Sequence, residues 1–525
     1  MPKVLISDAL SDAAVAIFRD RGVEVDFRPG LKADELMAII ENYDGLAIRS
    51  ATKVTKDVLA KARNLKVVGR AGIGVDNVDT EAATAHGVIV MNTPFGNSIT
   101  TAEHAISMMM ALAREIPQAN ASTHAGKWEK NRFMGVELYA KTLGLIGSGN
   151  IGSIVADRAQ GLKMKVVAYD PFLSAERAKD MGVEKVDFDT LLARADFITI
   201  HTPLTDSTRN LLNAETLAKT KKGVRIINCA RGGIVDEAAL LAALESGQVA
   251  GAALDVFAVE PAKENPLFGR DDVICTQHLG ASTEEAQENV ALQVAEQMSD
   301  YLLTGAVTNA LNTPSVSAED APRLKPYMAL AGQLGSFAGQ VTETGVQKVS
   351  IEFEGAVAKL NVKPLVQAAI AGLLKPFVDT VNMVNAPVVA RERGIEVSTK
   401  TIDGSGDYQT LIRVEVTTDR FTRTVSGTMF GGDKPRLVEI KGISIEAELA
   451  GNMLYITNTD KPGFIGALGS VLGDAGLNIG TFHLGRKDAG GEAIALLALD
   501  GSPSEEVLGK IKALPNVVQV KSLRF

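Results

Sequence analysis

The chain has little of several features that define whole classes of protein. Its 525 residues include only two cysteines, Cys229 and Cys275, which cannot build a disulfide framework, so a reducing compartment fits. Both lie in apolar, strand-like runs, and we expect buried thiols. The chain shows neither a signal-peptide layout nor an apolar run of about 18 residues. We therefore expect a cytoplasmic protein that does not cross a membrane.

An excess of basic residues is also missing. Lys and Arg number 54 against 63 for Asp and Glu, a net charge of −9 without long runs of one sign. This balance argues against non-specific binding to nucleic acid. The content of 46% hydrophobic and 22% charged residues is ordinary for a globular protein. The length predicts three or four domains, and small molecules are the expected partners.

The strongest pattern in the sequence is a glycine-rich turn between a predicted strand and a predicted helix. The apolar run Leu143–Ile146 has the length of a strand, and a G-x-G-x-x-G sequence follows it, with Gly147, Gly149 and Gly152. Apolar residues then recur at helical spacing. A second strand, Lys165–Tyr169, ends at Asp170. This order predicts a dinucleotide-binding βαβ unit.

Each element of this unit has a physical purpose. Gly147 permits a tight turn, Gly149 lets the backbone approach a pyrophosphate, and Gly152 lets the helix pack against the strand. The free N–H groups at the start of the helix face the anion. Asp170 follows Gly152 by 18 residues, a spacing typical of a carboxylate that binds the ribose hydroxyls. Because Asp170 would repel a 2′-phosphate, we expect NAD rather than NADP.

Further polar residues follow other predicted strands, and ligands bind outside the carboxyl ends of the strands in such sheets. The three that suit an oxidation are Arg231, Glu260 and His278. Histidine can take the hydroxyl proton of an alcohol, and a carboxylate such as Glu260 would orient its ring. An arginine such as Arg231 can hold a substrate carboxylate with two hydrogen bonds. We expect His201, in the turn His-Thr-Pro, to be structural.

The pattern of elements predicts an α/β chain of four domains. Residues 1–98 alternate strands and helices without a phosphate-binding turn, so we expect a flavodoxin-like substrate domain that is completed by 285–315. Residues 99–284 form the Rossmann-like NAD-binding domain. After a Pro/Ser-rich linker, 316–450 mix helices and strands as an α+β domain. Residues 452–525 follow a ferredoxin-like β-α-β-β-α-β order.

At this point the chain resembles the D-2-hydroxyacid dehydrogenases. Besides the glycine turn and Asp170, three motifs carry the resemblance: NCARGGIVDE (Asn228–Glu237), LDVFAVEP (Leu254–Pro261) and QHLGAST (Gln277–Thr283). Three others favour members with a phosphorylated substrate: RSATKVT (Arg49–Thr55), VVGRAGIGVDNVD (Val67–Asp79) and MNTPFGNS (Met91–Ser98). The resemblance covers essentially residues 1–315. It implies a substrate domain and a Rossmann domain that together oxidise a 2-hydroxy acid with NAD.

The resemblance implies roles for more positions at the cofactor. Beyond the glycines, Asp170 and His278, the cofactor-binding positions are Asn150, Ile151, Thr202, Cys229, Ala230, Asp255, Gly280 and Ala281. Asp255 would hold the nicotinamide carboxamide. Asn150 stands where relatives often carry arginine, so one pyrophosphate contact would be missing. Gln277 replaces the proline that usually precedes the catalytic histidine.

The resemblance also implies a substrate site, to which the catalytic residue Arg231 belongs. The other positions are Arg49, Ser50, Arg70, Ala71, Gly72, Ile73 and Gly74. The arginines are suited to a phosphate, although ordinary surface charge is an alternative for Arg49 and Arg70. Two other functions stay open: a dehydrogenase for glycerate, glyoxylate or 2-hydroxyglutarate, and a non-catalytic protein that senses NAD.

The last 74 residues resemble an ACT domain, and residues 316–450 resemble an intervening, allosteric substrate-binding-like domain. An ACT domain implies a small amino acid bound between paired copies, here L-serine, and a homo-oligomer, either a dimer or a tetramer. The matching positions are Asn458, Asp460 and Asn478. Asn458 stands where relatives have histidine or tyrosine. The alternative is a module that only pairs subunits and binds no effector.

Overall fold

The computed structural model of the chain describes residues 1–404, 406–449 and 451–525. The predicted domain boundary at residue 450 lies outside the described residues. The chain forms two compact units. Unit 1 comprises Met1–Ala9, Ala14–Asn92 and Val294–Phe525, and unit 2 comprises Leu10–Ala13 and Thr93–Gln293.

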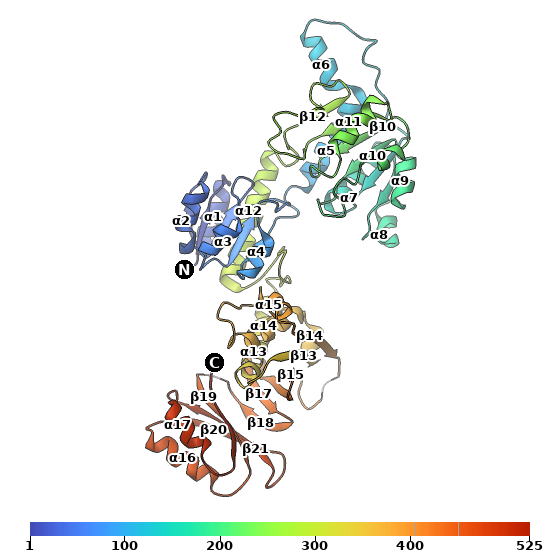
Figure 1. The fold of residues 1–525 in the computed structure, drawn as a ribbon. Coiled ribbons are helices and arrows are strands. Elements are labelled where there is room, and N and C mark those ends of the chain that lie inside the picture. The colour runs from blue at the N-terminus through green and yellow to red at the C-terminus, as the bar shows by residue number, and fades with distance from the viewer. Residues whose placement is uncertain (405, 450) are drawn as a thin grey trace. The chain divides into compact units, whose positions relative to one another are not determined.

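The first sheet of unit 1, drawn in blue in Figure 1, has five parallel strands in the order β2-β1-β3-β4-β5. The strands are β1 (Lys3–Ile6), β2 (Glu24–Phe27), β3 (Gly45–Ile48), β4 (Val67–Arg70) and β5 (Ile89–Met91). The helices between them are α1 (Asp12–Asp20), α2 (Ala33–Ile39), α3 (Lys56–Lys61) and α4 (Thr80–Ala85). Every residue of β3 is buried, as expected for a central strand with both faces covered. The α/β prediction for this region is confirmed.

Unit 2 is built on seven parallel strands in the order β12-β11-β10-β9-β6-β7-β8. They are β6 (Thr142–Ile146), β7 (Lys165–Tyr169), β8 (Glu184–Lys185), β9 (Phe197–Ile200), β10 (Val224–Asn228), β11 (Val249–Leu254) and β12 (Val273–Cys275). The strand order reverses between β6 and β9, which is the switch point where doubly wound sheets bind ligands. The Rossmann-like prediction is therefore confirmed.

Helices accompany this sheet along the chain. They are α5 (Ser98–Arg114), α6 (Ile116–His124), α7 (Asn150–Gly161), α8 (Ala175–Asp180), α9 (Phe188–Arg194), α10 (Ala214–Ala218) and α11 (Glu237–Glu245). The next helix, α12 (Glu284–Thr304), runs from unit 2 into unit 1, which begins again at Val294. One expectation is wrong here. Cys229 is buried, but Cys275 is exposed, because it is the last residue of the edge strand β12, which pairs on one side only. An apolar run alone does not distinguish an edge strand from a central one.

The second sheet of unit 1 has six strands in the order β14-β13-β15-β16-β17-β18. The strands are β13 (Val346–Gly355), β14 (Glu396–Ile402), β15 (Thr410–Thr418), β16 (Thr422–Phe430), β17 (Lys434–Ile440) and β18 (Ile443–Ala447), and the helices are α13 (Ala321–Gln340), α14 (Lys363–Leu374) and α15 (Ala386–Glu392). The sequence predicts the helices Leu324–Val341 and Lys363–Val381 and the strands Lys348–Glu354, Thr410–Thr417, Thr422–Met429 and Arg436–Ile440, but it predicts none of β14, β18 and α15. β14 is an edge strand without a buried residue, so it lacks the apolar alternation that predicts a strand.

The C-terminal module has the predicted β-α-β-β-α-β order, with its four strands arranged β20-β21-β19-β22. Its elements are β19 (Asn452–Thr459), α16 (Phe464–Asp474), β20 (Ile479–Arg486), β21 (Glu492–Leu499), α17 (Glu505–Lys512) and β22 (Val517–Arg524). One face of this sheet packs on α16 and α17. Residues of the other face, including Tyr455 and Leu496, belong to the same apolar core as α13 and α14. The ring of Tyr455 meets that of Phe337 edge to face, with centroids 5.4 Å apart. The module therefore shares a core with the six-stranded domain.

In the described part of the chain, we find no helix with both the length and the apolar content needed to cross a membrane.

Helices α13 and α14 approach each other through glycines. A Cβ added to Gly335 would lie 2.0 Å from the carbonyl oxygen of Ala369, and one added to Gly372 would lie 2.1 Å from that of Gly332. Backbone atoms cannot move aside as side chains do, so these glycines are required for the close contact. A Cβ on Gly332 itself would lie 3.7 Å from the nearest atom, an ordinary contact distance.

This difference gives a matched pair of variants. We predict that Gly335→Ala destabilises the six-stranded domain by about 2 kcal/mol, because overpacking forces the helices apart. Gly332→Ala should be neutral or stabilising by up to about 1 kcal/mol, since alanine favours the helix at a position with room. Thermal unfolding of both variants measures the difference. Equal effects would contradict the proposed helix contact.

Candidate active site

The glycine turn of unit 2 has the geometry that a dinucleotide requires. Gly147 has φ +90, and a Cβ there would lie 2.5 Å from the carbonyl oxygen of His201. A Cβ on Gly152 would lie 2.1 Å from the carbonyl oxygen of Gly147, so α7 starts close against the turn. Gly149 has no atom within 4 Å of such a Cβ, which leaves its outer side open. The turn therefore offers an open backbone surface and a helix N-terminus to an anion.

Asp170 lies beside this turn, directly after β7. Its Oδ2 accepts hydrogen bonds from the backbone N–H and the hydroxyl of Ser148, both at 2.8 Å. Its Oδ1 accepts from the N–H of Phe172 at 2.8 Å. Burial opposes the charged form, but these hydrogen bonds outweigh it and lower the pKa of Asp170. A fixed, charged carboxylate at this place fits the ribose hydroxyls of NAD.

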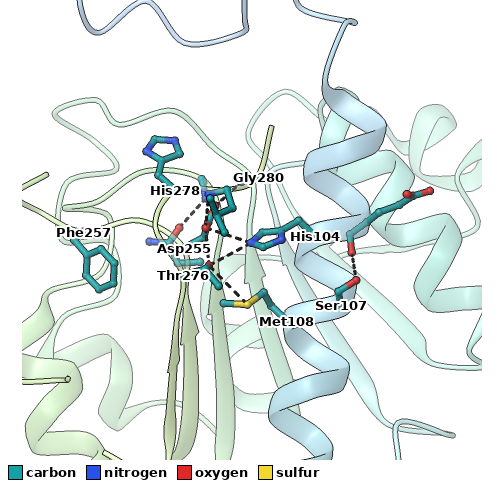
Figure 2. Close-up of polar contacts among 12 residues, drawn as sticks. His104, Ser107, Met108, Asp255, Phe257, Thr276, His278 and Gly280 are labelled. Atoms are coloured by element: carbon teal, nitrogen blue, oxygen red, sulfur yellow. Dashed lines mark hydrogen bonds and ion pairs between the residues drawn. The ribbon is translucent and has the colours of Figure 1, made fainter. Parts of the chain in front are cut away.

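Asp255 organises the loops at the carboxyl ends of β11 and β12, and Figure 2 shows Thr276, Gly280 and His104 around it. It follows β11 and is fully buried. Its Oδ1 accepts from the hydroxyl of Thr276 at 2.6 Å and from the N–H of Leu279 at 2.7 Å, and its Oδ2 accepts from the N–H of Gly280 at 2.8 Å. Nε2 of His104, on α5, lies 3.2 Å from Oδ1. Burial again disfavours the charge, and the hydrogen bonds led by that of His104 lower the pKa of Asp255.

These bonds fix the loop that carries His278. The N–H of His278 donates to the carbonyl oxygen of Asp255 at 2.8 Å, while the next two N–H groups reach the carboxylate. His278 has φ 57, in the left-handed region that few residues other than glycine adopt. The surrounding hydrogen bonds hold this conformation, which is a common arrangement at functional sites.

His278 and Glu260 form the pair that their sequence positions predict. Nδ1 of His278 lies 2.7 Å from Oε2 of Glu260, and Oε1 accepts from the N–H of Phe257 at 3.0 Å. Burial disfavours the carboxylate charge, but the hydrogen bonds from His278 and Phe257 outweigh this and lower the pKa of Glu260. An ionised Glu260 holds the proton of the imidazole on Nδ1, so Nε2 is left with a lone pair that can accept a proton.

Arg231 lies on the neighbouring loop. Asn228 shapes this loop by donating to the carbonyl oxygen of Arg231 at 2.9 Å and accepting from the N–H of Ala230 at 3.0 Å. A Cβ on Gly232 would lie 1.8 Å from the carbonyl oxygen of Phe257, so the loop packs directly against the segment that leads to Glu260. The positive charge of Arg231 also contributes to the lowered pKa of Glu260. Unit 2 thus brings Arg231, Glu260 and His278 together.

The other predicted cofactor positions follow the same strand ends. Thiol Sγ of Cys229 lies within 4.8 Å of a ligand atom of both Asp255 and His104, and burial raises its pKa. Ala230 and Thr202 follow β10 and β9, and Gly280 and Ala281 follow His278. Asn150 and Ile151 open α7, and the amide of Asn150 donates to the carbonyl oxygen of Pro94 at 3.4 Å. Nε2 of His201 lies 2.8 Å from the Thr199 hydroxyl, in keeping with a structural role.

The predicted substrate positions of unit 1 lie at the carboxyl ends of two adjacent strands. Arg49 and Ser50 follow β3, and Arg70 ends β4, where it is in register with Ile48 of β3. Nη1 of Arg70 donates to the carbonyl oxygen of Ala71 at 3.3 Å. A Cβ on Gly72 would lie 1.5 Å from the same Nη1, and Gly72 has φ +140, a conformation that residues with a side chain rarely adopt. Two arginines therefore share one edge of the five-stranded sheet.

Hydrogen bonds of two amide side chains fix the loop after Arg70, which contains Ile73 and Gly74. The amide of Asn92 donates to the carbonyl oxygen of Ile73 at 2.7 Å, and the amide of Gln297 donates to the carbonyl oxygen of Asn92 at 2.8 Å. Asn92 and Gln297 are both buried. Backbone N–H groups of a loop fixed in this way can bind an anion such as a carboxylate.

The predicted effector positions are divided. Asn458 and Asp460 line a cavity of about 280 Å³ beside the start of α16. Asn458 is buried, and its Oδ1 has no hydrogen-bond partner among the residues that the structure describes. Asp460 accepts from Nη1 of Arg486 at 2.7 Å and from the N–H of Gly490 at 3.2 Å. Asn478 lies outside the lining of this cavity and donates to Asp500 at 2.9 Å.

Several residues of these sites carry no signal in the sequence. His104 and Thr276 support Asp255, Ser148 holds Asp170, and Arg486 pairs with Asp460. His104 lies far before its partner in the chain, on an ordinary amphipathic helix. Only its contact in the folded chain distinguishes it from the other five histidines of the sequence.

Comparison with protein families agrees with the geometry of the site. Residues 106–280 match the family "D-isomer specific 2-hydroxyacid dehydrogenase, NAD binding domain". Residues 323–441 match the "D-3-phosphoglycerate dehydrogenase intervening domain", and residues 452–516 match the ACT domain. NAD is therefore the cofactor, and the open glycine turn with Asp170 fits it.

Comparison with individual proteins extends the family assignment to the whole chain. The chain is 47% identical to D-3-phosphoglycerate dehydrogenase of Bacillus subtilis (strain 168) over 523 residues, 99% of both chains. It is 44% identical to the enzyme of that name from Methanocaldococcus jannaschii over 522 residues, again 99% of both. Among solved structures, the TT0316 protein of Thermus thermophilus is 33% identical with a TM-score of 0.54, and the match covers 59% of this chain and 99% of that one. The chain therefore belongs to the D-3-phosphoglycerate dehydrogenases, within the NAD-dependent D-2-hydroxyacid dehydrogenase family.

Proposed function

We propose that the protein oxidises D-3-phosphoglycerate to 3-phosphohydroxypyruvate with NAD, the step that opens L-serine synthesis. The observation that carries this is the pair His278–Glu260 at 2.7 Å next to the Arg231 loop, on the edge of a dinucleotide-binding sheet. Two relatives that carry the name D-3-phosphoglycerate dehydrogenase match this chain over 99% of its length, and they support the choice of substrate.

The reaction removes a hydride and a proton from a secondary alcohol. The NAD bound at the glycine turn and Asp170 would supply the hydride acceptor. Nε2 of His278 accepts the hydroxyl proton, and Glu260 stabilises the imidazolium that forms. Arg231 binds the substrate carboxylate with two hydrogen bonds and polarises the oxygen that becomes the carbonyl. Gly147, Gly149, Gly152 and Asp170 hold the adenosine and pyrophosphate end of the cofactor.

Substrate choice depends on unit 1. Arg49 and Arg70 share one sheet edge, and two guanidinium groups there are suited to a phosphate. The loop Ala71–Gly74 would supply N–H groups to the carboxylate. A steady-state assay with D-3-phosphoglycerate and with D-glycerate separates this substrate from an unphosphorylated one. Activity with glycerate, glyoxylate or 2-hydroxyglutarate but none with phosphoglycerate would overturn the proposal, and no oxidation of any of them would favour a protein that only binds NAD.

The role of His278 leads to a first prediction. His278→Ala should lower turnover by at least about two orders of magnitude, because the base that takes the proton is lost. The initial rate of NADH formation measures this, and binding of NAD should persist. His124→Ala, which removes an exposed histidine at the end of α6, is the control and should retain normal turnover. Near-normal turnover of His278→Ala would remove His278 from the mechanism.

The position of Asp170 leads to a second prediction. Asp170→Asn should reduce the preference for NAD over NADP by at least about tenfold, because facing like charges cost several kcal/mol. Since hydrogen bonds lower the pKa of Asp170 below its usual range, the affinity for NAD should not change through this carboxyl from about pH 8 down to about pH 5. The ratio of kcat/KM for the two cofactors measures the first effect, and the dissociation constant of NAD across this pH range measures the second. Asp157→Asn, on the exposed side of α7, is the matched control, and an equal change there would contradict a specific role.

We also propose that L-serine binds at the cavity beside α16, between paired copies of the chain, and inhibits the enzyme. Asp460 would bind the ammonium group of serine. The Oδ1 of Asn458, which has no described hydrogen-bond partner, can accept a hydrogen bond from the ligand. Asn478 does not line this cavity, so it would reach the carboxylate side of the serine only from the paired copy. Arg486 already occupies Asp460, so the ligand must compete with this ion pair.

The effector site leads to a third prediction. Asp460→Ala should raise the serine concentration for half-inhibition by about tenfold or more, because a charge-assisted hydrogen bond is lost, and should leave the uninhibited turnover unchanged. Asp488→Ala, which changes an exposed aspartate close by, is the control. Serine titrations of the NADH signal measure all three proteins. If serine does not inhibit the wild-type enzyme, the effector proposal is wrong, and the C-terminal module would only pair subunits.

A further inference from the structure

The backbone around Arg49 is held by two side chains from outside its own loop. The first is Asp8, which follows β1, the neighbour of β3, and is 5% exposed. Its Oδ2 accepts from the N–H of Arg49 at 2.7 Å, and its Oδ1 accepts from the hydroxyl and N–H of Thr52 at 2.6 and 3.1 Å. The same hydroxyl lies 2.8 Å from that of Ser7. Asp8 thus binds both ends of the segment from Arg49 to Thr52.

The second side chain is that of Asn77, which lies after the loop that follows β4. Its amide donates to the carbonyl oxygens of Arg49 and Thr52, both at 2.7 Å. The backbone carbonyl oxygen of Asn77 accepts from the N–H of Val54 at 2.8 Å, and Val54 also forms a bridge with Val78. Asn77 is therefore anchored to the strand-like segment on the other side of the loop.

Together the two side chains fix both peptide groups that flank Arg49. Its N–H is bound by Asp8 and its carbonyl by Asn77, so the direction of its Cα–Cβ bond is set. In contrast, its guanidinium forms a single long hydrogen bond with the described residues, from Nη1 to the carbonyl oxygen of Ala9 at 3.5 Å, and Arg49 as a whole is only partly buried. A fixed backbone with a side chain that reaches outward is the arrangement expected when a functional group must be aimed at a ligand.

We propose that Asp8 and Asn77 are positioning residues for Arg49, and that the preference for a phosphorylated substrate depends on them. This inference rests on the proposed function, since it requires Arg49 to bind the substrate phosphate. A merely structural role predicts a different outcome: loss of either side chain would destabilise the fold without regard to the charge of the substrate.

The test is a double-mutant cycle on the full-length protein, with Asn77→Ala, Arg49→Ala and the combined variant. The measurements are kcat, KM for D-3-phosphoglycerate, KM for NAD, and kcat/KM for D-glycerate. We expect Asn77→Ala to raise KM for phosphoglycerate about tenfold, with kcat, KM for NAD and the weaker glycerate rate changed less than about twofold. In the Arg49→Ala background, the same change should have no further effect, because Asn77 acts through Arg49.

Two further variants are compared with Asn77→Ala. Asp8→Asn preserves the volume and one acceptor oxygen, so it should raise the same KM by less than Asn77→Ala does. Asn64→Ala is the matched control, since the amide of Asn64 also donates to a backbone carbonyl of this sheet domain, that of Glu41 at 2.7 Å. It should leave every kinetic constant unchanged.

The outcomes separate the two proposals. Equal effects of Asn77→Ala with and without Arg49, or equal losses with phosphoglycerate and glycerate, overturn the positioning role while the function stands. A wild-type protein that oxidises another hydroxy acid but not phosphoglycerate overturns the proposed function and this inference together.

Discussion

The catalytic loop of unit 2 depends on one buried carboxylate. Asp255 has no exposed surface, and an uncompensated charge there would be costly. Its cost is offset by N–H groups from the very loop that carries His278, together with Thr276 and His104. If the loop moved away, the charge of Asp255 would lose its N–H donors, so the left-handed backbone conformation of His278 is maintained. Orientation of the imidazole toward Glu260 follows from this constraint.

A buried carboxylate organises a loop in unit 1 as well. Asp8 follows β1 and binds N–H groups after β3, just as Asp255 follows β11 and binds N–H groups after β12. In both cases the acceptor stands at the end of one parallel strand and the donors at the end of its neighbour. Parallel sheets leave these backbone groups without ladder partners at the carboxyl edge, and a charged acceptor satisfies several of them at once. The two units use the same solution with unrelated sequences.

Local patterns predicted much of the architecture. The glycine turn, Asp170 and the parallel strands of both sheets could be located because each depends on a short stretch of sequence with a clear period. The residues after the strands that carry Arg231 and His278 could be grouped because parallel strands end at one edge. β14 was missed because its residues are exposed on an edge, and Cys275 was wrongly expected to be buried for the same reason.

What the sequence could not show is which distant side chains meet. The contacts of His104 with Asp255, of Asp8 with Thr52 and of Arg486 with Asp460 join residues far apart in the chain, and each residue type is common on protein surfaces. The hydrogen bond of the Asn478 amide to Asp500 is a further contact that its own motif does not indicate. Such pairings are decided by tertiary packing and have no local signature.

The core shared by the six-stranded domain and the ACT sheet has a consequence for where this chain can be divided. Tyr455 and Leu496 of the ACT sheet are fully buried in the same cluster as Phe337 of α13. Separating the two modules would expose large apolar faces on both, which favours aggregation. In a chain with this core, a truncation between the two modules would leave an apolar face of each uncovered, so the boundary that sequence similarity draws between them is not a boundary between independent folding units.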